Sequence, residues 1–278
     1  MSLRINNDVK ALSILRNLGL AQTAGDRAIG RLSSGFRISR AADDAAGLAI
    51  ANQLRAEVGS LRVATRNAEQ AGSLLSVAEG GLQGIQQVLF RMQELASQAA
   101  SDNVDGAGRD LLQTEFTELQ SEIDRIADNT KFSGTDLLNA AGTTLNFVVG
   151  AESSNSISFA SLEVTAASLG VANATLGNGA GDGTSAGASA ALTSINSALD
   201  TLATAFASVG ATQSRVDSAL NQAQIALENT AAAESVIRDA DFAAEFTALT
   251  KAQILSQTGV SVLAQSNARA QSVLALLQ

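Results

Sequence analysis

The sequence predicts a mainly α fold, a long antiparallel helical bundle or coiled coil with paired N- and C-terminal helices and a small β-hairpin region. Apolar residues recur at alternating spacings of three and four along three long stretches, which is the pattern of a coiled-coil seam. The 278 residues include no proline, so nothing breaks a long helix. Apolar residues make up 46% of the chain and aromatic residues only 3%, so alanine and aliphatic side chains must fill the core.

The composition also argues against several classes of function. With no His and no Cys, the chain lacks the usual zinc ligands and the commonest general base near neutral pH. We therefore expect no enzyme, no catalytic residue, no cofactor and no metal. The net charge of −9 argues against nucleic acid as a partner, because phosphate binding needs a basic surface. No apolar run reaches the roughly 18 residues that predict a membrane span.

The first 33 residues predict an amphipathic helix rather than a cleavable signal peptide, because polar residues interrupt the apolar run. Gly35 is suited to ending this helix in the left-handed conformation. Asp43 or Asp44 is suited to capping the next helix. The segment 31–58 therefore predicts two helices joined by a compact polar connection.

The second helix is predicted from Asp44 to about Ser101. Its seam comprises Leu61, Ala64, Ala68, Ala71, Leu75, Ala78, Leu82, Ile85, Leu89, Met92, Ala96 and Ala99. Residues 101–106 then form a turn. Asp102, Asn103 and Asp105 superficially suggest a calcium loop, but Leu112 stands where the bidentate acid belongs, so we prefer the turn.

A third helix carries one apolar stripe, made of Leu112, Phe116, Leu119, Ile123 and Ile126. Beyond it, the alternating segments 145–149 and 157–159 predict a hairpin with its turn at 150–155. Residues 172–191 are rich in Gly, Ala, Ser, Thr and Asn, which predicts a mobile surface loop.

The C-terminal part contains two further helical stretches. The first has its seam at Leu192, Ile195, Leu199, Leu202, Phe206, Val209, Gln213, Val216, Leu220, Ala223 and Leu227. The second runs from about Ala240 to Gln278 and mirrors the amphipathic first helix. We expect residues 1–43 and 236–278 to form a terminal-helix domain. Residues 44–235 then form a long-helix domain, with the hairpin and the Gly-rich loop at about 140–190.

Two paired terminal helices would still keep apolar surface facing outward, and such surface favours contact with further copies of the chain. A contact that joins different patches of successive copies can generate a helical polymer. A soluble coiled-coil binding module would explain the repeat without a polymer.

Several motifs resemble those of bacterial flagellins. The opening motif runs from Arg31-Leu32-Ser33-Ser34-Gly35 to Ala42-Asp43-Asp44-Ala45-Ala46-Gly47. The closing motif is Ala233-Glu234-Ser235-Val236-Ile237-Arg238-Asp239-Ala240-Asp241-Phe242-Ala243. The resemblance covers roughly 1–140 and 188–278. It implies a filament subunit with its terminal helices in an inner tube, in a short form without large outer domains.

The resemblance also implies partners and a place in the cell. The partners are further copies of the chain in a homopolymer, the filament cap, the hook-associated junction proteins and an export chaperone. The expected location is the extracellular filament, reached through the flagellar secretion system without a cleaved signal peptide. A hook-filament junction protein and a non-flagellar coiled-coil module remain alternatives.

Candidate site residues follow from the same resemblance. Subunit contacts are expected at Arg31, Arg37, Arg40, Phe242, Phe246, Leu274 and Leu277. A strip for the innate immune receptor of flagellin would comprise Arg91, Leu95, Gln98 and Glu115. Phe90 and Gln93 stand where that pattern commonly has Gln and Arg. Arg91 and Glu115 are equally compatible with solvated charges or with packing between subunits.

Overall fold

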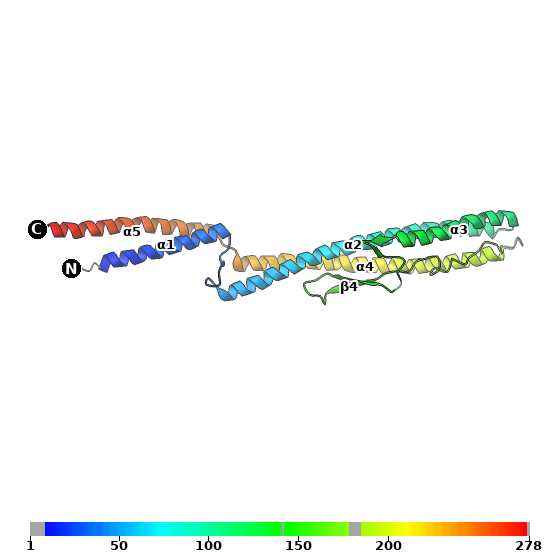
Figure 1. Ribbon diagram of the computed structural model, residues 1–278, viewed down its shortest axis with the longest axis horizontal. Coiled ribbons are helices and arrows are strands. Elements are labelled where there is room, and N and C mark those ends of the chain that lie inside the picture. The colour runs from blue at the N-terminus through cyan, green and yellow to red at the C-terminus, as the bar shows by residue number, and fades with distance from the viewer. Residues whose placement is uncertain (1–8, 141, 178–184, 277–278) are drawn as a thin grey trace. The chain divides into compact units, whose positions relative to one another are not determined.

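The computed structural model describes residues 9–140, 142–177 and 185–276, with side chains to residue 268 in the last range. They fall into a terminal unit, drawn from 1–58 and 228–278, and a long-helix unit, drawn from 59–227. The elements are α1 (Val9–Ser34), α2 (Ala45–Ala99), α3 (Gly106–Asn129), β1 (Lys131–Phe132), β2 (Thr135–Asp136), β3 (Thr144–Val148), β4 (Ser156–Ala160), α4 (Ala186–Arg238) and α5 (Phe242–Leu276). The predicted mainly α fold is confirmed (Figure 1).

The seam predicted for α2 is confirmed at every position. All twelve of its residues, from Leu61 to Ala99, are buried. Those from Ala68 onward belong to one core that α3, α4 and the hairpin of β3 and β4 complete. α2 has 55 residues and is about 80 Å long at the standard rise. Its seam therefore contributes buried side chains along most of the long-helix unit.

The connection between α2 and α3 is a turn, as preferred over a calcium loop. Asp105 caps α3, because its side chain accepts a hydrogen bond of 2.8 Å from the amide of Gly108. The buried Arg109 guanidinium donates to the carbonyl of Ala99, the last residue of α2, at 2.8 Å. It also donates to the carbonyl of Ser101 in the turn at 3.0 Å. Phe116 and Ile123 on the predicted stripe of α3 are fully buried.

The seam of α4 differs from the prediction at alternate positions. Ile195, Leu202, Val209, Val216 and Ala223 are buried as expected. The remaining buried positions lie one residue earlier than predicted, at Ala191, Ala198, Ala205 and Thr212. The larger side chains of Leu192, Leu199 and Phe206 are half-buried and pack against the edge of the core. Small residues therefore occupy the fully buried positions at these alternate sites, and Gln213 lies beside the seam, where it donates to Glu79 Oε2 at 3.0 Å.

The predicted hairpin forms from β3 and β4, which pair antiparallel with Leu145 opposite Phe159 and Phe147 opposite Ile157. Burial alternates along β4, where Ile157 and Phe159 face the core. The two-stranded β1–β2 hairpin was not predicted. Its turn residues Ser133 and Gly134 have φ of 51° and 84°, the conformation of a type I′ hairpin turn.

The predicted loop at 172–191 is wrong for residues 186–191, which belong to α4, whereas residues 172–177 are an irregular segment that is tied to α3. Leu176 is fully buried, and its amide donates to Gln113 Oε1 at 2.6 Å. Gln120 on α3 donates to the carbonyls of Val171 and Ala174, so two glutamine side chains replace the missing backbone partners of this segment. The other end begins α4, where Ala188 is buried. Residues 178–184 of the predicted loop lie outside the described residues.

The described residues between α3 and α4 form two small hairpins and their connecting turns, which fits a short form without a large outer domain. Across the described ranges, no helix combines the length and the hydropathy that crossing a bilayer requires.

Candidate self-assembly site

The terminal helices α1 and α5 lie side by side and antiparallel (Figure 1). Arg31, near the end of α1, pairs with Glu245, near the start of α5. Small residues form the contact: a Cβ on Gly25 would lie 3.4 Å from that of Ala252, and one on Gly259 would lie 3.3 Å from Leu18 Cδ1. The helices therefore approach closely and bury few large side chains against each other.

The large apolar side chains of this pair lie mostly on its outside. Phe242 is 60% exposed and Phe246 is 65% exposed. Other exposed apolar residues are Val9, Leu12, Leu15, Leu20 and Ile29 on α1, and Ile254, Leu255, Val260 and Val262 on α5. Exposed apolar side chains in this number mark a surface that another molecule covers. The side chains of Leu274 and Leu277 lie outside the described residues.

The segment after α1 and the segment that joins α4 to α5 meet in a clasp, which we define as residues 35–37 and 237–240. Gly35 ends α1 with φ of 75°, as predicted, and its carbonyl accepts from the amide of Ala240 at 2.9 Å. The amide of Arg37 donates to the carbonyl of Arg238 at 2.7 Å, so Phe36 and Asp239 pair as an isolated antiparallel bridge. The opening and closing sequence motifs, about 200 residues apart, are thus joined through their backbones.

Side chains reinforce the clasp. The guanidinium of Arg238 lies 4.1 Å from the centroid of the Phe36 ring, a cation–π contact. Arg37 donates through its guanidinium to the carbonyl of Ile237 at 2.6 Å. Sequence reasoning identified Arg37 but missed Arg238. The sequence feature that could have identified Arg238 is its position within the closing motif, because that segment pairs with the segment of the opening motif.

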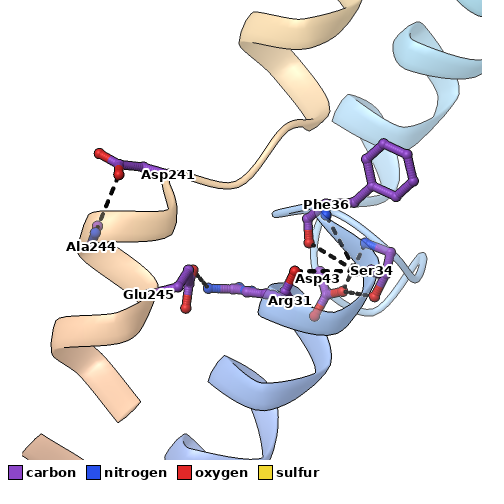
Figure 2. A network of polar contacts seen from close by, with 8 residues as sticks. Arg31, Ser34, Phe36, Asp43, Asp241, Ala244 and Glu245 are labelled. Carbon is purple, nitrogen blue, oxygen red and sulfur yellow. Dashed lines mark hydrogen bonds and ion pairs between the residues drawn. The ribbon is translucent and has the colours of Figure 1, made fainter. Parts of the chain in front are cut away.

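The connection from α1 to α2 is ordered by two adjacent carboxylates with separate roles. Asp44 caps α2, because its Oδ1 accepts from the amide of Gly47 at 2.9 Å. Asp43 instead accepts from the amides of Ser39 (3.3 Å) and Arg40 (3.1 Å), and so closes the turn before the helix. On the other side of the clasp, Asp241 caps α5 through the amides of Ala243 and Ala244 (Figure 2). The predicted cap at 43 or 44 is therefore Asp44.

The turn at Asp43 is expected to loosen in acid. The hydrogen bond from the Arg40 amide, aided by those from Ser39, holds the pKa of Asp43 below its ordinary value of 3.8. A lowered pKa means that the stabilisation is complete above that ordinary value and is lost as pH falls through the folded-state pKa. In an NMR titration, the Arg40 amide proton should shift with a midpoint below 3.8. A midpoint at or above that value would contradict the assigned bonds.

The predicted contact arginines differ in how the chain itself uses them. Figure 2 shows Arg31 reaching across to Glu245, with 2.8 Å between Nη1 and Oε1, in a half-buried ion pair. Arg37 belongs to the clasp. Arg40 is exposed, and its side chain has no ion pair or hydrogen bond within the described residues. Whether these arginines touch neighbouring copies stays a prediction.

The residues of the predicted receptor strip lie on α2 and α3 of the long-helix unit. Arg91 pairs with Glu115 at 2.7 Å and with Glu94 at 3.0 Å, and the hydrogen bond that Arg91 donates to Glu115 raises the pKa of Arg91. Gln98 is exposed, but Leu95 is only 1% exposed and packs in the core. Leu95 therefore offers almost no surface to a partner, and receptor binding itself stays a prediction.

The fold and this site together define a class: long-helix proteins whose two chain ends pair and present apolar surface outward, the design of a self-assembling subunit. Comparison with known proteins agrees. The bacterial flagellin N-terminal helical region matches residues 5–143, and the bacterial flagellin C-terminal helical region matches residues 192–277. The chain belongs to the bacterial flagellin family.

Individual relatives extend over the whole chain. It is 38% identical to a flagellin of Halalkalibacterium halodurans over 275 residues, 99% of each chain. It is 34% identical to a flagellin of Bacillus subtilis over 304 residues, covering 99% of this chain and 100% of the relative. A solved structure described as a flagellar hook-associated protein of Vibrio parahaemolyticus matches 71% of this chain and 99% of its own, with a TM-score of 0.57 at 15% identity, which shows a shared fold alone. The chain is accordingly a structural subunit of the flagellar filament.

Proposed function

We propose that the subunit polymerises by burying the outer apolar surface of α1 and α5 against neighbouring copies. The observation that carries this proposal is the inverted arrangement of the pair, in which small residues face inward and Phe242, Phe246 and Val260 face outward. Burying a large apolar side chain contributes about 1.5–3 kcal/mol. Repeated over many copies, these side chains supply the main driving force, while Leu274, Leu277, Arg31, Arg37 and Arg40 add contacts.

The remaining roles follow from the family. The subunit leaves the cell through the flagellar secretion system without a cleaved signal peptide. An export chaperone, the filament cap and the hook-associated junction proteins are its partners, and the polymer works mechanically in motility with no catalytic role. The exposed Arg91, Gln98 and Glu115 are the surface through which an innate immune receptor would bind.

Placing a charge on the outer surface of α5 should block polymerisation. In Phe246→Asp, a residue that is 65% exposed in the single chain carries an unpaired carboxylate into the polymer contact. We expect the critical concentration for filament growth on sheared seeds to rise at least about tenfold, equivalent to about 1.4 kcal/mol or more. Pelleting assays and electron microscopy measure this.

Gln257→Asp is the matched control, because it adds the same charge at an exposed polar position of the same helix. Thermal unfolding of both monomers should match the parent chain. Chains lacking residues 1–33 or 241–278 should form no filaments at any concentration tested. Normal growth of Phe246→Asp, or filaments from either truncated chain, would refute polymerisation through the terminal helices.

A further inference from the structure

The side of α5 that faces α1 follows one row of the helix, which we call the inward row. Between 242 and 265, the residues that are not exposed recur at spacings of four and three, and they are Glu245, Leu249, Ala252, Ser256, Gly259 and Leu263. Such spacing is that of a coiled-coil seam. Three of the six positions hold a charge, a hydroxyl or no side chain, so the inward row is a poor apolar seam.

A more apolar row lies beside the inward row. It shares three positions with the inward row and is completed by Phe246, Gln253 and Val260. Turning α5 about its own axis by about 50°, half the angle between successive residues, would bring this second row against α1. Burial of apolar area alone favours the second row, because it would cover Phe246 and Val260. In the structure these two side chains are instead 65% and 54% exposed.

The backbone contacts and the small residues of the pair do not choose between the two rows. Gly25 and Ala252 let the helices approach closely, but they form no large knob whose fit would resist a small rotation. The clasp joins the backbone at 35–37 and 237–240, before the first turn of α5. It brings the two helix ends together but contains no side chain of α5. Another contact must therefore select the inward row.

The Arg31–Glu245 ion pair is placed to make this selection. Arg31 lies in the last turn of α1 and Glu245 in the first turn of α5, where each charge also suits the dipole of its own helix (Figure 2). The two side chains are 33% and 13% exposed, with 2.8 Å between Nη1 and Oε1. The other charged residues of 11–34, Arg16, Asp26 and Arg27, form no ion pair with the described part of α5.

We propose that Arg31 and Glu245 are positioning residues, which act within one copy to select the inward row of α5. Turning α5 to its second row would carry Glu245 away from Arg31 and remove the attraction between two partly buried charges. One polar contact in a helix seam can select a single arrangement in this way. Phe246 and Val260 consequently stay on the outer surface. The inference rests on the proposed polymerisation, because it concerns how the surface that neighbours bury is presented.

Charge exchange within one chain tests the role of this pair in assembly. The variants are Arg31→Glu, Glu245→Arg and the chain that combines both. Each single variant places like charges against each other, so the critical concentration for growth on sheared seeds should rise about tenfold or more. The combined chain restores an opposite pair and should return to within about fivefold of the parent, the remainder reflecting the reversed charges at the helix ends.

Thiol accessibility tests the rotation of α5 directly in the monomer. The chain has no cysteine, so Val260→Cys introduces a single thiol on the second row. Adding Glu245→Arg should slow its reaction with a maleimide about threefold or more, because α5 then turns this position toward α1. The combined charge exchange should restore the rate. Thr258→Cys is the matched control, since this exposed position points away from α1 with either row inward, and its rate should not change.

The possible results separate this pair from polymerisation in general. If the parent chain does not polymerise, the proposed function fails, and the thiol rates still decide whether the pair sets the rotation. Normal growth of either single variant, no recovery in the combined chain, or an unchanged thiol rate at position 260 overturns the inference. Parental growth in an equimolar mixture of the two single variants also overturns it, because the pair would then form between copies.

Circular dichroism shows whether each variant is folded. If Glu245→Arg unfolds the chain, Glu245→Gln replaces it in both measurements, because it removes the charge without introducing repulsion. This milder variant must still raise the critical concentration and slow the reaction of the thiol at position 260. Parental values in either measurement overturn the inference.

Discussion

Replacing Phe116 with alanine should lower the free energy of unfolding by about 3–5 kcal/mol. Phe116 is fully buried on α3, in the core that this helix shares with α2, α4 and the hairpin of β3 and β4. With aromatic residues making up only 3% of the chain, a cavity of this size has few large neighbours able to refill it. Urea unfolding followed by circular dichroism measures the change.

Phe90→Ala is the matched control for Phe116→Ala. Phe90 lies on α2 of the same unit but is 48% exposed, so its truncation removes less buried area and leaves no closed cavity. We expect its cost to stay below about 1 kcal/mol. Equal losses at Phe116 and Phe90 would show that α3 is not packed against the core as described.

The long seam of α2 was predictable because it follows one spacing for 39 residues and faces the core throughout. The seam of α4 was harder. Two parallel stripes, one of alanines such as Ala198 and one of large residues such as Leu199, both keep the three-and-four spacing. Hydrophobicity favours the stripe of large residues, but the structure buries the stripe of small ones. The sequence of one helix does not reveal which of two such stripes will face the core.

The sequence was least informative where distant segments meet. The clasp depends on backbone bonds between residues about 200 positions apart, and no local pattern predicts such pairing. Only the resemblance drew attention to both of its strands. The packing of residues 172–177 was missed for a different reason. Their small side chains indicate a loop, but Gln113 and Gln120 supply hydrogen bonds that let this segment pack against α3. The short β1–β2 hairpin had a local signal in Ser133-Gly134, which sequence reasoning did not use.

Two adjacent glycines in the middle of α2 should respond in opposite directions to alanine. Gly80 is exposed and a Cβ there would meet nothing within 4 Å, so Gly80→Ala should stabilise the protein by about 0.5–1 kcal/mol through helix propensity. A Cβ on Gly81 would lie 2.6 Å from Thr130 Oγ1 and 2.7 Å from Leu138 Cδ1. Gly81→Ala should therefore cost about 1–3 kcal/mol despite the same gain in propensity.

The cost at Gly81 arises because its neighbours cannot move aside freely. Thr130 ends α3, where both its amide and its hydroxyl donate to the carbonyl of Ile126, and Leu138 is fully buried. Combining Gly81→Ala with Thr130→Ala should recover part of the loss, since it removes two of the three closest atoms. Urea unfolding of the four chains gives the coupling energy directly. Additive effects, or stabilisation by Gly81→Ala alone, would mean that the segment after α3 does not cross α2 at this glycine.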